Sequence, residues 1–307
     1  MENISVKTAN KFMLMILMWL TFVSVLLPLV VGNMGITLGP SIIISQILVF
    51  LIPFIVYIIT KKEEILPLIN KVLMLKSLSG KNVAFVLGMM VLIHPTILVI
   101  SFLSTLFTPN IIGDVVIDIT AYGFLIGFLI IAITPSIFEE IIFRGVIFYE
   151  YKNVSIHKAA FMNGIFFGII HMNLHQAISA FVLGFFFIYI IYYTKSFFSV
   201  FLAHVYFNGV QFAILYFASS NPELLYAAAA AAEEEVEVMP LLILAGLTLP
   251  LFIMLFTKFT RYNSINIENE NENENENIED KPRERIFTIH SIVTIVIFIV
   301  FNILIMI

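Results

Sequence analysis

The chain has 307 residues, of which 60% are hydrophobic and 12% are charged, and its mean hydropathy is +1.02. This composition excludes an ordinary soluble domain and predicts an all-α, polytopic transmembrane helical bundle. There is no cysteine, which excludes thiolate chemistry, and the net charge of -5 comes mostly from two acidic tracts and gives no indication of nucleic-acid binding.

Apolar segments long enough to cross a membrane recur along the chain and predict about eight or nine spans. The first segment follows Lys7 and Lys11 and lacks a clear small-residue cleavage site, so we interpret it as a retained helix and not as a signal peptide. The predicted spans cover residues 12–32, 41–60, 83–108, 119–148, 159–173, 176–194, 196–218, 240–257 and 286–307.

The basic residues predict the orientation of these spans. Every lysine and arginine except Arg144 falls in a connection on one face, whereas the segments GNMGITLGP and AEEEVEV fall on the other. Because basic residues in short loops favour the cytoplasmic side, we expect a cytoplasmic N-terminus and an external C-terminus. The Ile-, Asn- and Lys-rich usage indicates an AT-rich genome, so we expect an integral protein of a microbial cell membrane.

Three connections differ from ordinary loops. Residues 61–81 combine charges with an apolar stripe, which fits a short interfacial helix on the cytoplasmic leaflet and an ordinary loop equally well. The alternation of Asn and Glu from Asn266 to Asn277 predicts a disordered linker, which makes the last span resemble an appendage. The alanine run Ala227–Ala232 favours helix but indicates no function.

Three charged residues interrupt the fourth predicted span, in the sequence PSIFEEIIFRG. Charges inside a spanning helix are costly, so they indicate a functional site. Glu140 and Arg144 are four residues apart and can pair on one helix face, which leaves Glu139 without a local partner. The alternative is structural, with both glutamates sharing Arg144 to lock helices together.

Further polar residues lie at a similar depth in other spans. His171 lies 13 residues beyond Lys158, and His204 and Asn208 follow Lys195 by 9 and 13 residues. At about 1.5 Å per residue, these offsets correspond to roughly 13 to 20 Å from the cytoplasmic face. We therefore expect these side chains to meet Glu139 in one cavity, although a single membrane histidine is more often a packing residue.

The other histidines carry weaker signals. His94 precedes Pro95 in an apolar span and is interpreted as structural, and His157 and His290 lie at membrane boundaries. His175 lies four residues after His171, so it is either a second ligand of a metal pair or the beginning of the next span.

The sequence resembles the family of CAAX proteases and bacteriocin-processing proteins, which includes the Ras-converting CAAX prenyl endopeptidases and the Abi immunity-type proteins. Three motifs carry the resemblance in order, over about residues 120 to 212: EEIIFRG (Glu139–Gly145), FGIIH (Phe167–His171) and HVYFN (His204–Asn208). Each motif alone is weak, but the ordered set inside membrane spans is fairly specific.

The resemblance implies an intramembrane endopeptidase that activates a water molecule with a glutamate. Glu139, helped by His171, would be the general base. His204 and Asn208 would donate hydrogen bonds to the oxyanion, and Glu140 and Arg144 would support the site. No cofactor is then needed. The alternative is a zinc metalloprotease whose ligands are Glu139, His171 and His204, although asparagine is a poor zinc ligand and HExxH is absent.

The expected organisation has a catalytic core with membrane helices on both sides. Its parts are N-terminal helices with an interfacial segment near 61–81 (1–118), the core (119–218), an acidic outer loop with the eighth span (219–265), the linker (266–285) and the last helix (286–307). The expected partners are the lipid bilayer and a peptide or lipidated protein substrate, of prenylated CAAX or leader-peptide type. A non-proteolytic immunity or scaffold protein is a further alternative, and a transporter is disfavoured because no inverted repeat is visible.

Overall fold

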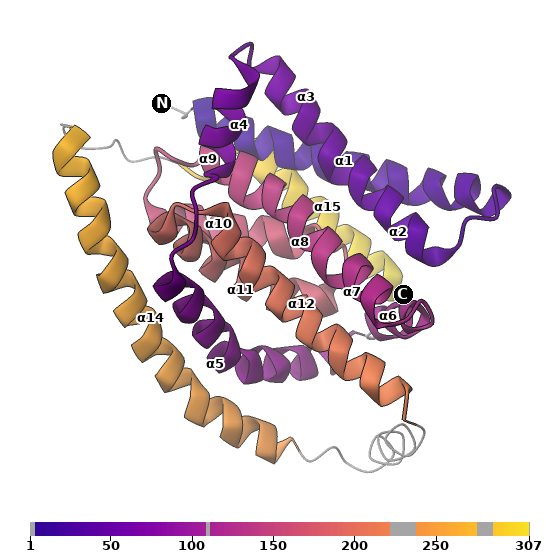
Figure 1. Cartoon of the computed structure of the whole chain (residues 1–307). Helices are drawn as coiled ribbons and strands as arrows, with labels where there is room; N and C mark the ends of the chain where they lie inside the picture. Colours follow the sequence, from indigo (N-terminus) through magenta and orange to yellow (C-terminus); the bar gives the residue numbers. More distant parts are fainter. Residues whose placement is uncertain (1–3, 109–110, 222–237, 275–284, 307) are drawn as a thin grey trace.

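The structure, a computed structural model, describes residues 4–108, 111–221, 238–274 and 285–306. Over these residues the chain is all-α, as predicted, and the only β pairing is an isolated bridge between Leu75 and Ser196. The helices form a bundle in which α14 runs along the outer edge and α1, α2 and α3 lie together on another side (Figure 1).

The N-terminal part begins with α1 (Ile4–Asn33), which crosses the bundle as one long helix. The chain then returns through one continuous helical segment, Leu38–Thr60, made of α2 (Leu38–Gln46), the π-helical turn η1 (Ile47–Leu51) and α3 (Ile52–Thr60). A short amphipathic helix, α4 (Ile65–Leu73), follows within the predicted interfacial segment. Its Leu68, Val72 and Leu73 are buried whereas Leu66 is exposed, so the helical alternative holds for this connection.

The segment that leads to the site is made of several helices. α5 (Gly80–Thr105) begins at Ser79, whose hydroxyl accepts a hydrogen bond from the Asn82 backbone N–H at 3.3 Å and so caps the helix. After α6 (Ile111–Thr120), Gly123 adopts φ +80° and starts a second continuous helical segment. Its parts are α7 (Phe124–Phe128), η2 (Leu129–Ile133), α8 (Thr134–Glu140), η3 (Ile141–Ile147) and α9 (Phe148–Glu150).

The next two helices, α10 (Ile156–Ile169) and α11 (Leu174–Thr194), form a closely packed hairpin. A Cβ atom on Gly168 would lie 2.6 Å from the Ala177 carbonyl oxygen, and one on Gly164 would lie 2.8 Å from the Phe181 carbonyl oxygen. Small residues spaced in this way let two membrane helices approach backbone to backbone. The hairpin therefore holds the turn between the two helices in a defined place.

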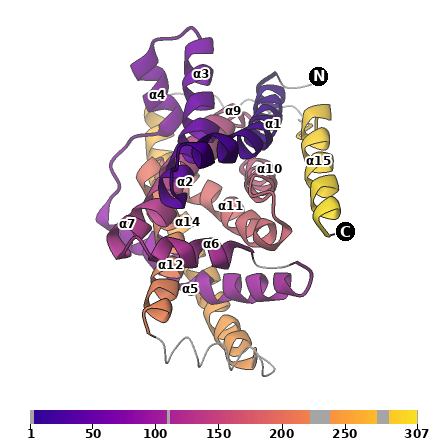
Figure 2. The same cartoon turned by 90° about the vertical axis from the view of Figure 1, so that its right-hand side faces the viewer.

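The remaining helices are α12 (Phe197–Ser219), α14 (Met239–Glu274) and α15 (Ile289–Met306). α14 packs against α5, and the buried amides of Asn82 and Asn263 exchange two hydrogen bonds of 3.1 and 3.0 Å. α15 packs along α1, so the last helix belongs to the bundle (Figure 2). The interpretation of this span as an appendage was therefore wrong.

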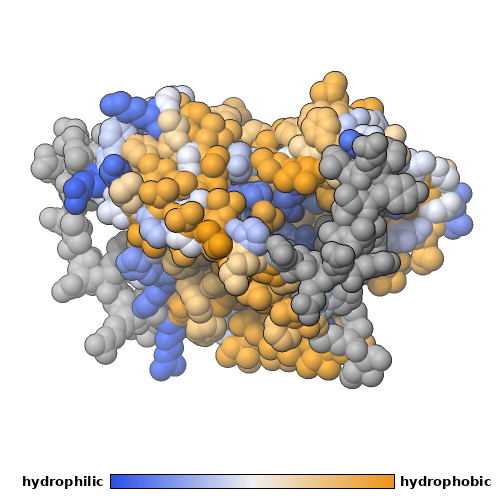
Figure 3. All heavy atoms as spheres, turned by 90° about the horizontal axis from the view of Figure 1, so that it is seen from below, coloured by the Kyte–Doolittle hydropathy of each residue, from blue (hydrophilic) through white to orange (hydrophobic). Residues whose placement is uncertain are grey.

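Seven of the described helical segments are long and apolar enough to cross a membrane, against about eight or nine predicted. The two other predicted spans correspond to α10, with 14 residues, and α15, with 18 residues. At about 1.5 Å per residue, α10 is only about 21 Å long, which is short of a hydrocarbon core of about 30 Å. Large hydrophobic side chains face outward along the spans, and the face in Figure 3 is mostly hydrophobic with hydrophilic residues near its centre. The chain is an integral membrane protein.

One end of the bundle is fastened by a buried carboxylate, Glu150, at the end of α9. Its Oε1 accepts a hydrogen bond from the Tyr57 hydroxyl at 2.6 Å and forms an ion pair with Lys61, and its Oε2 accepts one from the Ser5 hydroxyl at 2.8 Å. The bridge of Leu75 with the α11–α12 connection ties the same end further. Basic connections that are distant in sequence therefore meet there, while the cytoplasmic orientation of this end stays a prediction.

Two of the predicted special connections fall partly or wholly outside the described residues. The alanine run and the acidic stretch AEEEVEV, except for its last residue Val238, lie within residues 222–237, outside the description. α14 continues as helix to Glu274, into the segment where the sequence predicts a disordered linker, and residues 275–284 lie outside the description. Extending an existing helix costs far less than nucleating one, which explains how the helix enters a polar tract.

Candidate active site

The three charged residues of the fourth predicted span lie where the helix changes its winding. Glu139 and Glu140 end α8, and Arg144 lies in the π-helical turn η3 that follows. Glu140 and Arg144 are 0% exposed, and Glu139 is 8% exposed. Single π-helical turns are frequent at functional sites because the added residue redirects the side chains around it.

Glu140 and Arg144 form the predicted ion pair. Arg144 Nη1 donates a hydrogen bond to Glu140 Oε1 at 2.8 Å. The same carboxylate oxygen contacts His204 Nδ1 from α12 at 2.7 Å. Glu140 therefore serves two partners, one on its own helix and one on a helix 64 positions away in sequence, and it fixes the rotation of α12 against α8.

Two aromatic rings enclose the Arg144 guanidinium. Its Cζ atom lies 4.3 Å from the ring centre of Phe167 on α10 and 4.9 Å from that of Phe187 on α11. Nε and Nη2 have no hydrogen-bond partner among the described residues. Cation–π contacts are worth about 2 kcal/mol when the cation is desolvated, so these rings stabilise a charge that one carboxylate contacts on one side only.

Glu139 is the less engaged of the two glutamates. Its Oε2 has no hydrogen-bond partner among the described residues and lies 3.9 Å from His204 Nε2. His204 thus lies between the glutamates, with Nδ1 toward Glu140 and Nε2 toward Glu139. A buried carboxylate that has an oxygen without a hydrogen bond and lies beside an imidazole is suited to exchange protons.

His171 lies in the turn between α10 and α11, and not within a spanning helix as predicted. α10 ends at Ile169, and the turn that follows places His171 in the lining of the cavity. His171 Nδ1 contacts the Phe167 carbonyl oxygen at 2.7 Å, so a proton on Nδ1 is held there and Nε2 is the nitrogen left for other partners. No direct contact between His171 and Glu139 is present in the described residues.

Asn208 is held by a carbonyl group that a proline sets free. Pro135 has no N–H, so the Ile131 carbonyl, four residues earlier, lacks the usual intrahelical donor. Asn208 Nδ2 donates to this oxygen over a long distance of 3.4 Å. The second N–H of the amide is then available for another acceptor.

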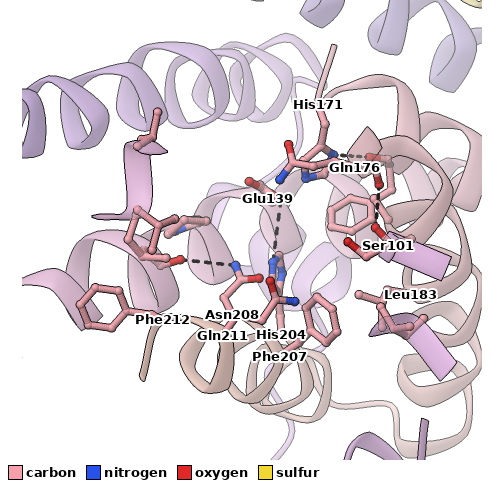
Figure 4. A pocket seen from close by; sticks show the side chains of 18 of the residues that line it. Ser101, Glu139, His171, Gln176, Leu183, His204, Phe207, Asn208, Gln211 and Phe212 are labelled. Carbon is pink, nitrogen blue, oxygen red and sulfur yellow. Dashed lines mark hydrogen bonds and ion pairs between the residues drawn. The ribbon is translucent and has the colours of Figure 1, made fainter. Parts of the chain in front are cut away.

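Glu139, His171, His204 and Asn208 all line one cavity of about 390 Å³ (Figure 4). Its other polar lining residues come from several helices and include Gln46, Ser101, His175, Gln176, Ser179 and Gln211. A cavity of this size accommodates a few peptide residues or part of a lipid chain. The structure therefore brings together the four polar residues that the sequence predicts at similar depth.

The other histidines take separate places. His175 begins the next span, in the first turn of α11, where its Nε2 contacts the Ser101 hydroxyl at 3.4 Å. His94 is buried against the rings of Tyr206 and Phe207, and neither ring nitrogen has a hydrogen-bond partner among the described residues. His157 bonds the Tyr189 hydroxyl at 2.6 Å near the beginning of α10.

The sequence reasoning missed several residues that build the site. Asn163, buried in α10, donates to the Phe143 carbonyl oxygen at 2.7 Å and so holds the π-helical turn that carries Arg144. Phe187 and the Ile131 carbonyl were also missed. The sequence carried a signal only for the Ile131 carbonyl, because Pro135 has no N–H and so frees the carbonyl four residues earlier in a helix.

A metal-binding cluster was also considered in the sequence. Within the described ranges, no group of three or more His, Cys, Asp or Glu side chains is arranged to hold a metal ion. His204 presents Nδ1 to Glu140 and not to the cavity, so only its Nε2 is free to serve as a ligand.

Residues 121–210 match the model of the family described as type II CAAX prenyl endopeptidase Rce1-like. The chain contains a domain of this family. The Rce1-like domain includes Glu139, Glu140 and Arg144 as well as His171, His204 and Asn208, and it agrees with the predicted resemblance over residues 120 to 212. At the level of the family, the domain is that of a CAAX-type intramembrane protease. No curated protein and no solved structure matches the chain.

Proposed function

We propose that the chain is an intramembrane endopeptidase in which Glu139 activates a water molecule. The observation that carries this proposal is the unequal environment of the two adjacent glutamates. Glu140 Oε1 contacts both Arg144 and His204, although Glu140 Oε2 has no hydrogen-bond partner among the described residues. Glu139 instead lines the cavity beside His204 Nε2. A general base needs a free lone pair within reach of a water molecule, and Glu139 has one.

Counting charges supports an assignment of the protons. Two carboxylates and one guanidinium lie together in a buried cluster. The cluster is electrically balanced when one additional proton is held between Glu139 and His204. With that proton on His204, its Nδ1–H donates to Glu140 and its Nε2–H points to Glu139 and the cavity. His204 is then a hydrogen-bond donor and Glu139 is an ionised base.

The reaction follows from these positions. Glu139 removes a proton from a water molecule in the cavity, while the water oxygen attacks the carbonyl carbon of the substrate peptide. The carbonyl oxygen becomes an oxyanion, which receives hydrogen bonds from His204 Nε2–H and from the free N–H of Asn208. Glu139 then delivers its proton to the leaving amine as the C–N bond breaks, and the products are an amine and a carboxylic acid, which loses its remaining proton to solvent. His171 assists from its free Nε2 by orienting the water.

The substrate that we propose is a peptide with an apolar or lipidated portion, of prenylated CAAX or leader-peptide type. The cavity lies inside the hydrophobic bundle, and its lining combines amide side chains with aliphatic and aromatic ones. For a microbial chain with a cytoplasmic N-terminus, this substrate would reach the site from the membrane or from its cytoplasmic surface.

The experiment is cleavage of a fluorogenic farnesylated CAAX peptide by purified protein in detergent. The arms are wild type, Glu139→Gln and wild type with a strong zinc chelator, and the control is Gly246→Ala, a change on α14 in open space and outside the cavity lining. We expect wild type and the control to cleave with and without the chelator, and Glu139→Gln to be inactive. Full turnover by Glu139→Gln would refute the assignment of the base.

The same arms separate the two rival functions. Loss of activity with chelator and recovery with zinc would favour a metalloprotease that uses Glu139, His171 and His204. No cleavage of the farnesylated peptide, nor of a set of leader peptides, would favour a non-proteolytic immunity or scaffold protein. In that case Glu139→Gln would alter stability or partner binding instead of catalysis.

A further inference from the structure

The last helix, α15, is attached to the rest of the molecule at two levels. Near its beginning, Asn10 Nδ2 of α1 donates to the Ile286 carbonyl oxygen and to the Thr288 hydroxyl, both at 3.0 Å. Near its end, Asn302 Oδ1 accepts a hydrogen bond of 2.9 Å from the backbone N–H of Leu174. The helix therefore connects the N-terminal part of the chain to the first residue of α11.

The Asn302 amide is oriented for this contact. Its Nδ2 donates to the Phe298 carbonyl oxygen of its own helix at 2.9 Å, so Oδ1 points away from α15. The side chain is buried, with the residue 9% exposed. Because lipid offers no competing donors, a buried acceptor at this position keeps its partner.

Leu174 directly follows the turn that carries His171. The first N–H groups of a helix have no intrahelical acceptor, and in α11 two of them donate to asparagine side chains instead. Asn302 takes the Leu174 N–H, and Asn173 Oδ1 takes the His175 N–H at 2.8 Å. Met172 lies between His171 and Asn173, and its φ of +51° is unusual for a residue with a side chain. A backbone in that conformation persists only where its surroundings hold it.

We propose that Asn302 is a positioning residue, which places His171 at the cavity by anchoring the turn between α10 and α11. This inference rests on the proposed function, in which His171 assists Glu139. Without the acceptor on α15, the Leu174 N–H has to find another partner, and the turn moves with it. A displacement of about 1 Å in an assisting group lowers a rate by up to about 100-fold.

The test is a double-mutant cycle between Asn302 and His171 with the full-length protein in detergent. Asn302→Leu removes the acceptor at similar volume, and Asn302→Asp keeps an acceptor oxygen in place. The matched control is Asn263→Leu, which removes another buried asparagine that hydrogen-bonds a neighbouring helix, on α14. Turnover and KM are measured together with amide hydrogen exchange of the turn.

We expect Asn302→Leu to lower kcat about 10- to 100-fold with KM little changed, and Asn302→Asp to restore most of it. In a His171→Ala background, Asn302→Leu should cause no further loss, because the group that it positions is gone. Asn263→Leu should lower the melting temperature and leave kcat of the folded protein unchanged. Exchange in the turn should rise with Asn302→Leu only.

The inference is overturned if the losses from Asn302→Leu and His171→Ala multiply, or if Asn302→Leu affects only the melting temperature, as in the control. A wild-type protein that cleaves no peptide refutes the proposed function instead. Hydrogen exchange still decides in that case whether Asn302 holds the turn.

Discussion

Replacing Glu140 by glutamine should destabilise the protein, whereas the same change at Glu139 should not. Glu140 Oε1 accepts hydrogen bonds from both Arg144 and His204, and Glu140 and Arg144 are completely buried. Breaking a buried ion pair by removing one partner costs about 3 to 5 kcal/mol, because the other charge stays buried without compensation. Glu139 Oε2 has no hydrogen bond among the described residues, so its neutralisation removes a buried charge and only the 3.9 Å contact with His204 Nε2.

The expected loss of stability is large enough to appear as a clear fall in the melting temperature. A loss of about 3 to 5 kcal/mol corresponds to a fall in melting temperature of roughly 10 °C for a protein of this size. Thermal unfolding of the purified variants in one detergent measures it directly. We expect Glu139→Gln to melt within a few degrees of wild type and Glu140→Gln to melt far below it.

A double replacement supplies the control. Glu140→Gln together with Arg144→Met removes both charges, and we expect it to recover part of the stability lost by either change alone, because no unpaired charge remains. If Glu139→Gln melts as low as Glu140→Gln, both glutamates share Arg144 and the division into a structural and a catalytic carboxylate is wrong.

Three further changes test other parts of the site. Gly168→Ala should separate α10 from α11 and lower both stability and activity, because its Cβ would lie 2.6 Å from the Ala177 carbonyl oxygen; Gly246→Ala, with open space around it, should be harmless in the same melting assay. Asn208→Leu should lower kcat about 100- to 1000-fold with little change in melting temperature. Phe187→Leu should destabilise the buried guanidinium by about 1 to 2 kcal/mol, and an unchanged melting curve would refute the cation–π assignment.

The local part of the site was predictable from the sequence. The spacing of Glu140 and Arg144 requires only a helix to bring them together, and the π-helical turn leaves that pair intact. The sequence also predicted that His204 and Asn208 lie near Glu139, because the three residues are at similar depths in the membrane. These depths were counted from the lysines that flank each span. The ordered motifs indicated the family, and the family match over residues 121–210 confirmed it.

The rest depended on how helices rotate and end. The contact of His204 Nδ1 with Glu140 depends on the rotation of α12 about its axis, and apolar residues on all sides of a membrane helix hide that rotation from its sequence. The early end of α10 places His171 in a turn, and no proline marks it. The contact of Asn302 with Leu174 joins segments 128 residues apart, and no pattern in either segment indicates it.

The cavity wall is built partly by the Rce1-like domain and partly by helices outside it. The assigned chemical groups lie in the Rce1-like domain, but α2 and α5 contribute Ile42, Gln46, Ile97 and Ser101 to the same cavity from outside it. Substitutions in these two helices would reshape the space offered to a substrate while every motif residue stays in place. Selectivity can therefore drift independently of catalysis, and two chains with identical motifs can accept different peptides.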